Sequence, residues 1–178
     1  MNTKIFAAAA LAVASLAAAP AFAQALGPVQ GYGNLGAAHI SAQGNDYTTL
    51  GGRLGARFGS YLGLEGEAAF GVDGDKGTLA GAPYSSKLKS AFAGYAVGYY
   101  PVTPKFDLFA RVGYGTTKFN LKTPGLSVSD SNDSWNYGGG GQYFFTARDG
   151  VRADFTRESF TNGPGHANVW AASYVRKF

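Results

Sequence analysis

Charged side chains in this chain recur at alternate positions of short segments that are otherwise apolar. Arg53 and Arg57 lie in one such segment, and Glu65 and Glu67 lie in the next. Because successive side chains of a β-strand point to opposite faces, residues two or four positions apart share a face. The polar residues that this spacing assigns to one face of their strands are Arg53, Arg57, Glu65, Glu67, Asp107, Arg111, Gln142, Arg152, Asp154 and Glu158.

Carboxylates and guanidinium groups gathered on one face could serve three kinds of chemistry. They could neutralise one another as ion pairs, line a path for ions, or supply a carboxylate pair for general acid–base catalysis. If the strands close into a barrel of eight, the interior is only wide enough for side chains, which favours pairing. We therefore expect a lumen filled by a paired polar network, and we predict no catalytic, cofactor-binding or metal-binding residues.

Eight segments show the alternation of apolar and polar residues that is typical of strands. They span approximately residues 29–40, 49–58, 62–70, 88–100, 106–119, 135–145, 151–160 and 168–178. Short links (59–61, 101–105 and 146–150) alternate with longer ones (41–48, 71–87, 120–134 and 161–167). Short periplasmic turns alternating with longer outer loops are typical of transmembrane barrels. The predicted fold is therefore all-β, an eight-stranded antiparallel up-and-down transmembrane β-barrel with extracellular loops at 71–87 and 120–134.

The first short link fixes the register of its hairpin. A three-residue turn at Gly59-Ser60-Tyr61 pairs Phe58 with Leu62, so that both apolar sets fall on one side. Arg53 then lies opposite Glu67, and Arg57 lies diagonal to Glu65. Opposite charges at such cross-strand positions attract, so the sequence predicts Arg53–Glu67 and Arg57–Glu65 pairs.

The last strand indicates which face meets lipid. Trp170, Tyr174 and Phe178 share one face, and aromatic rings near both ends of a strand suit the two interfaces of a bilayer. A terminal strand with a free edge invites aggregation, so we expect it to pair with the first strand and close the barrel. By the apolar parity of their strands, the predicted lipid-facing residues include Leu54, Leu64, Val97, Leu108, Val112 and Phe155.

One stretch is unusual for a strand, the run of glycines from Gly138 to Gly141. Glycine weakens a strand and often marks a bend or the close approach of another backbone. Aromatic residues resume the alternation on both sides of the run. We therefore expect tight curvature or a closely approaching neighbour there, rather than a flexible linker.

The first residues are those of an export signal. Lys4 precedes an apolar run from Ile5 to Ala19, and Pro20-Ala21-Phe22-Ala23 supplies a small-residue cleavage site. We predict a signal peptide over residues 1–23 and a barrel domain over residues 24–178. No later apolar run is long enough for a transmembrane helix.

Composition supports the membrane barrel and excludes other classes. Charged residues make up 15% of the chain, against about 25% in soluble domains. There are 27 glycines and no cysteine, so no disulfide staples the fold. The net charge of +4 is scattered along the chain, and no nucleic-acid partner is expected.

Five stretches resemble the outer membrane protein A-type transmembrane barrel. They are Gly98-Tyr99-Tyr100-Pro101-Val102-Thr103 with DLFARVGYG at 107–115, Gly141-Gln142-Tyr143 with GVRADF at 150–155, and the ending from Ser173-Tyr174 to Phe178. The resemblance implies that Trp170, Tyr174 and Phe178 form the assembly signal of such barrels. Two features depart from the family pattern. Arg176 stands where an apolar or aromatic residue is usual, and no peptidoglycan-binding domain follows the barrel.

The resemblance implies a structural protein of a Gram-negative-type outer membrane, contributing to envelope integrity and possessing outer loops for surface interaction. Its implied partners are outer membrane lipid, lipopolysaccharide and the barrel-assembly machinery, and the chain is expected to be a monomer. A small gated ion-conducting pore is the main alternative. A soluble periplasmic lipocalin-like barrel would need its apolar faces turned inward, which the aromatic-ended last strand disfavours.

Catalysis is the remaining alternative. Lipid A-modifying enzymes on small barrels use a His and Ser pair on the outer surface. The only two histidines here are His39 and His166, both at predicted loop ends, and His166 lies in a Gly-Pro-Gly-His turn with no acid beside it. We therefore expect solvated loop histidines and no enzyme.

Overall fold

The computed structural model describes residues 28–42, 45–72, 74–79, 82–123, 126–161 and 165–178. The strands are β1 (Val29–Ala42), β2 (Asn45–Phe58), β3 (Leu62–Gly71), β4 (Gly74–Leu79), β5 (Ala82–Thr103), β6 (Phe106–Thr123), β7 (Leu126–Phe144), β8 (Asp149–Phe160) and β9 (His166–Lys177). None of the described residues forms a helix that is long and apolar enough to cross a membrane. The signal peptide predicted over residues 1–23 lies outside the described residues and stays a prediction.

The strands form one closed antiparallel barrel. Apart from β3 and β4, strands that are consecutive in the chain pair with each other, and β1 closes the circle by pairing with β9 from Tyr32 opposite Lys177 to Ala42 opposite Ala167. β3 and β4 pair one after the other along the same neighbour, β5, and so occupy a single place in the wall. The barrel wall therefore has eight strand positions, or staves, as the alternation predicts.

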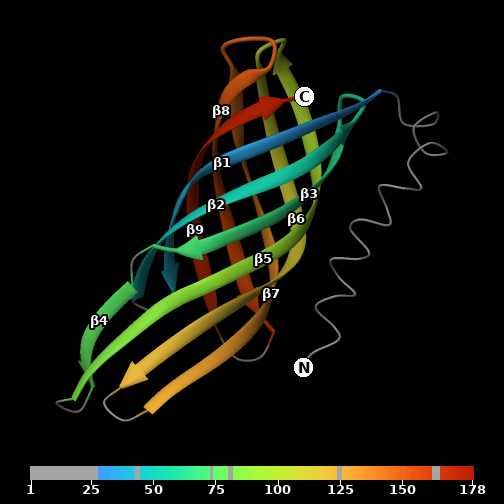
Figure 1. Cartoon of the computed structure of the whole chain (residues 1–178). Coiled ribbons are helices and arrows are strands. Elements are labelled where there is room, and N and C mark those ends of the chain that lie inside the picture. The colour runs from blue at the N-terminus through green and yellow to red at the C-terminus, as the bar shows by residue number, and fades with distance from the viewer. Residues whose placement is uncertain (1–27, 43–44, 73, 80–81, 124–125, 162–164) are drawn as a thin grey trace.

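Three of the predicted long loops are largely strand. Residues 74–79 pair with 82–87, residues 120–123 pair with 126–129, and β1 and β2 pair as far as Ala42 opposite Asn45. The ends of β4, β5, β6 and β7 extend beyond the closed part of the barrel (Figure 1). The alternation did not predict these extensions because cross-strand backbone hydrogen bonds need no apolar face once a hairpin leaves the hydrocarbon layer.

The turn between β2 and β3 sets the register that the sequence predicts. Gly59 has a φ of 61°, in the left-handed region that glycine adopts without steric cost. Phe58 lies opposite Leu62, and Arg53 lies opposite Glu67. The charges of this hairpin therefore share the inner side of the wall.

Most of the predicted lipid-facing residues lie on the outer side. The exposed fractions are 71% for Leu54, 50% for Leu64, 45% for Leu108 and 53% for Val112. Phe155 shares this outer face and packs against Trp170, with ring centroids 4.7 Å apart. In a bilayer this apolar exterior is the surface that contacts lipid.

The prediction that Val97 faces lipid is wrong. It is 2% exposed and lies opposite Arg111 and Gly63, on the lumen face of β5. Both faces of this strand are apolar, since Tyr95 and Val97 alternate with residues such as Tyr100, so hydrophobicity alone does not distinguish them. Pairing with the charged faces of β3 and β6 decides the orientation.

The outer face makes a testable prediction about stability. Leu54→Arg should lower the free energy of unfolding by about 2–4 kcal/mol, because it places a charge in the hydrocarbon layer. Tyr61→Arg, in the exposed turn at the end of the hairpin, is the control and should cost about 0–1 kcal/mol. Urea unfolding in lipid vesicles measures both values. Equal costs for the two variants would show that the outer face is not the lipid-facing one.

Candidate functional site

The centre of the lumen holds a network of charges from four strands, β2, β3, β6 and β8. Arg53 of β2 donates from Nε to Glu67 Oε2 at 2.5 Å and from Nη1 to Asp154 Oδ1 at 2.6 Å. Arg111 of β6 reaches the same two carboxylates, with Nη1–Oε2 and Nη2–Oδ2 distances of 3.1 Å and 2.9 Å. Two arginines thus face two carboxylates in a closed arrangement that links β2, β3, β6 and β8.

A second ion pair lies beside this arrangement. Arg152 of β8 donates to both oxygens of Glu65 of β3, at 2.5 Å and 3.1 Å, and neither side chain is exposed to solvent. The hydroxyl of Tyr32 donates to the same carboxylate at 2.7 Å. Because Arg152 Nε also lies 3.4 Å from Asp154, the pair joins the central network.

Arg57 does not pair with Glu65 as predicted. Its Nη1 donates to Asp107 of β6 at 2.8 Å, and Gln142 of β7 donates to the same carboxylate at 2.9 Å. The reason is closure of the barrel, which brings Asp107 within reach of Arg57 while Arg152 occupies both oxygens of Glu65. These residues do share the lumen face, as predicted. Arg57 pairs across the lumen with Asp107, however, and not with Glu65 of its own hairpin.

Glu158 is the predicted site residue that stands apart. It lies opposite Asn136 on β7 and is partly buried. Within the part of the chain that the structure describes, it makes no ion pair of the kind that links the other carboxylates. It shares the lumen with the network without belonging to it.

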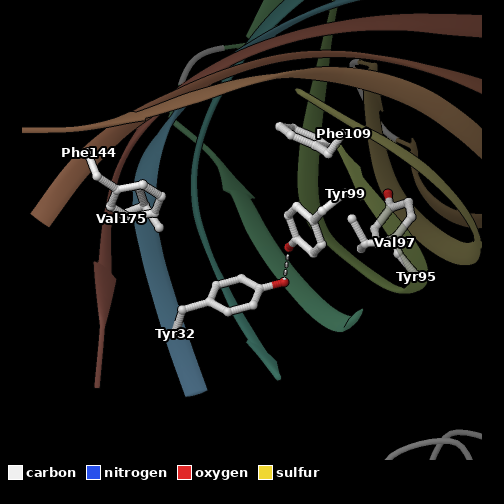
Figure 2. Packing of buried hydrophobic residues seen from close by; sticks show 7 residues of the cluster. All are labelled: Tyr32, Tyr95, Val97, Tyr99, Phe109, Phe144 and Val175. Carbon is white, nitrogen blue, oxygen red and sulfur yellow. Dashed lines mark hydrogen bonds between the residues drawn. The ribbon is translucent and has the colours of Figure 1, made fainter. Parts of the chain in front are cut away.

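Aromatic side chains fill the lumen around the charges, and the sequence reasoning missed them. Figure 2 shows the buried cluster, whose members are Tyr32, Tyr95, Val97, Tyr99, Phe109, Phe144 and Val175. The hydroxyls of Tyr32 and Tyr99 lie 2.7 Å apart. The spacing of two could have predicted the position of Phe109, because Phe109 lies two residues from both Asp107 and Arg111 and so shares their face.

Three arginines lie over these rings. The guanidinium carbon lies 3.8 Å from the ring centroid of Phe109 for Arg152, and 4.3 Å from that of Tyr95 for Arg111. Arg57 lies 4.4 Å from the centroid of Tyr99. Each buried cation therefore has both carboxylate and aromatic partners, which offsets part of its desolvation.

The space left at one end of the lumen is small. A cavity of about 10 Å³ lies among Tyr32, Arg57, Gln142, Phe144 and Lys177, at the lower limit for one water molecule. Lys177 Nζ lies 3.6 Å from the ring centroid of Phe144 and borders this cavity. At the opposite end, a second buried cluster contains Ile40, Tyr47, Ala167 and Val169.

The two histidines lie outside the lumen network. In the described part of the chain, no group of three His, Asp or Glu side chains could hold a metal ion. His39 Nε2 lies 3.6 Å from Asp46 on the exposed end of the β1–β2 hairpin, and His166 is exposed at the start of β9. Arginines instead pair with the carboxylates of Glu65, Glu67, Asp107 and Asp154.

A closed eight-stave wall with an apolar exterior and a charged interior matches a known family. The family model for the outer membrane protein beta-barrel domain covers residues 8–178. The chain belongs to this family. It is therefore a bacterial outer membrane protein, and the apolar exterior of the barrel lies in lipid.

Solved structures share the fold of this outer membrane barrel. Ail of Yersinia pestis, crystallised with the heparin analogue sucrose octasulfate, has a TM-score of 0.62 and 18% identity, over 85% of this chain and 100% of that one. The N-terminal barrel of Pseudomonas aeruginosa OprF has a TM-score of 0.58 and 11% identity, over 83% and 99%. Neisserial surface protein A has a TM-score of 0.56 and 9% identity, over 84% and 97%. A search of curated proteins returned no match.

Proposed function

We propose that the chain is a structural and surface protein of the outer membrane whose lumen is closed by the polar network. The supporting observation is that Arg111, Arg152, Glu65 and Asp154 are almost fully buried and bonded to one another. Ions crossing the lumen would have to break several of these charge-assisted bonds at once. The barrel would contribute to the envelope by its wall and by its projecting hairpins, and not by transport or catalysis.

Orientation and assembly belong to the same proposal. The end with the short links would face the periplasm, and the end that carries the β4–β5 and β6–β7 hairpins would face outward, where it could meet surface partners. Trp170, Tyr174 and Phe178 lie on the outer face of β9 and its end, with exposed fractions of 62%, 44% and 71%. We assign them the role of a signal to the barrel-assembly machinery, and we assign the folded chain as a monomer among lipid and lipopolysaccharide.

Conductance in planar bilayers tests the closed lumen. The unmodified protein should show no steady large conductance, because paired side chains fill the interior. Glu67→Ala should produce openings, since Glu67 is the most exposed carboxylate of the central network, at 16%, and its loss frees one bond each of Arg53 and Arg111.

Asp46→Ala is the matched control, because Asp46 is an exposed carboxylate outside the lumen. It should leave the recordings unchanged. A steady, large conductance that is the same in the unmodified protein and in Glu67→Ala would contradict the closed lumen. The gated-pore alternative would then replace it.

A further inference from the structure

The outer wall of the barrel contains a depression, unrelated to the lumen. It has a volume of about 620 Å³ and crosses β7, β8, β9 and β1. Its floor contains small residues that lie directly opposite one another, in the order Gly141, Ala153 and Ala172. Since neighbouring strands are about 4.8 Å apart, these three residues span about 10 Å across the wall.

Large side chains stand beside this outer-wall depression. On one side, the adjacent positions of the same strands carry a first ridge, made of Phe106, Tyr143, Val151, Tyr174 and Leu35. Beyond the lining residues, Phe155 and Trp170 pack against each other two positions from Ala153 and Ala172 on the same outer face. The depression is thus an apolar trough that the first ridge lines, open to the lipid side of the wall.

Cationic side chains gather at the end of the barrel nearest the first ridge. Tyr174 Oη donates a hydrogen bond to Asp149 Oδ1, and Arg176 Nη1 lies 3.3 Å from that same oxygen. Arg148 and Lys105 are exposed in the two adjacent turns, whose backbones are tied to β9 and β7 respectively. The cations are thus Arg176, Arg148 and Lys105. The anions beside them are Asp149 and the carboxylate of Phe178, so this rim carries a net positive charge.

We propose that the outer-wall depression binds one phospholipid molecule, with an acyl chain in the trough and the phosphate against Arg148 and Arg176. An acyl chain is the apolar group of suitable shape that surrounds a transmembrane wall. A phosphate supplies the negative charge that the rim lacks, and arginine binds phosphate by charge-assisted hydrogen bonds. Tyr174 connects the two parts, since its ring lines the trough while its hydroxyl reaches the charged rim.

A second copy of the barrel is a less suitable occupant. Two barrels in one membrane are related by a twofold axis along the membrane normal, so the same ends lie at the same height. The cations of both rims would then lie side by side and repel each other. A lipid phosphate has the opposite charge and meets no such penalty.

Quenching of tryptophan fluorescence tests the proposal. Trp170 lies two positions from Ala172 on the outer face of β9, and Trp135 is the other tryptophan of the chain, so Trp135→Phe leaves Trp170 as the reporter. Folded protein in uncharged detergent micelles is titrated with phosphatidylglycerol that carries dibrominated acyl chains. We expect saturable quenching, and we expect brominated diacylglycerol, which has no phosphate, to require a higher concentration for the same effect.

Two kinds of variant separate the trough from the rim. Arg148→Gln and Arg176→Gln should each raise the half-quenching concentration about fivefold, whereas Lys89→Gln, exposed at the other end of the barrel, should not. Ala172→Leu fills the floor and should weaken quenching. Ala96→Leu makes the same change on the outer face of β5 and should have no effect. Heat-modifiable migration on a gel confirms that each variant is folded.

The opposite results would overturn the site. Equal quenching by the phosphate-free lipid, with no effect of either arginine variant, would mean ordinary contact with the surrounding lipid. Identical behaviour of Ala172→Leu and Ala96→Leu would mean that no chain lies in the trough. A dimer in sedimentation experiments that Ala172→Leu dissociates would show that a second copy occupies the depression.

Discussion

Glu65→Gln should lower the free energy of unfolding by about 3–5 kcal/mol, because it leaves Arg152 as a buried charge without its main partner. Arg152 donates to both oxygens of Glu65, and neither side chain is exposed. The same carboxylate accepts a hydrogen bond from Tyr32 at 2.7 Å and lies 3.9 Å from Arg111. Glutamine keeps the shape of the side chain but removes the charge that these groups require.

Urea titration of the folded barrel in lipid vesicles measures this loss. Asp46→Asn is the control, because the Asp46–His39 pair is exposed and such pairs contribute about 0–1 kcal/mol. A cost for Glu65→Gln no larger than that of Asp46→Asn would show that the lumen pairs add little to stability.

A double variant separates charge from packing. Glu65→Met combined with Arg152→Met removes both charges together, and buried pairs replaced by apolar residues often cost little. Asp154 keeps Arg53 and Arg111 as partners in this variant. We therefore expect the double variant to be more stable than Glu65→Gln. If it is less stable, the network contributes through attraction and not merely by avoiding an unpaired charge.

Gly138→Ala should lower the free energy of unfolding by about 3 kcal/mol, the upper end of the cost of overpacking. A Cβ at this position would lie 2.0 Å from the carbonyl oxygen of Phe155 on the paired strand β8. That contact involves backbone, so it can be relieved only by moving the two strands apart.

Gly98→Ala is the matched control for this variant, because a Cβ at Gly98 meets nothing within 4 Å. It should be neutral or slightly stabilising, since alanine loses less backbone entropy than glycine on folding. Both are measured by the same urea titration. Equal stability of the two variants would mean that β7 and β8 can separate at no cost.

The glycine run shows how much local sequence reasoning can predict. Because aromatic alternation resumes on both sides, a closely approaching neighbour was one of two expectations for Gly138 to Gly141. The structure supplies that neighbour, since a Cβ at Gly140 would lie 2.1 Å from the carbonyl oxygen of Ala153, and one at Gly139 would lie 2.7 Å from that of Phe109. The sequence could not identify these atoms, because they belong to β8 and β6.

The sequence by itself determined the number of staves, the closure by the last strand and the shared face on which the charges of each of β2, β3, β6 and β8 lie. These features follow from a period of two and from one short turn, which are local properties of the chain. The alternation did not predict the extended hairpins, because a strand outside the hydrocarbon layer needs no apolar face.

Only the tertiary structure decided which charges meet. Arg53 and Asp154 pair although they are 101 residues apart in the sequence. Arg57 pairs with Asp107, although Glu65 is closer to it in the sequence. The orientation of Val97 was likewise decided by pairing with β3 and β6, because both faces of its own strand are apolar. The physical reason is the same in each case. Alternation shows which residues of a strand share a face, whereas the side that a face turns to and the partners across the lumen depend on how all eight strand positions pair and stagger when the barrel closes.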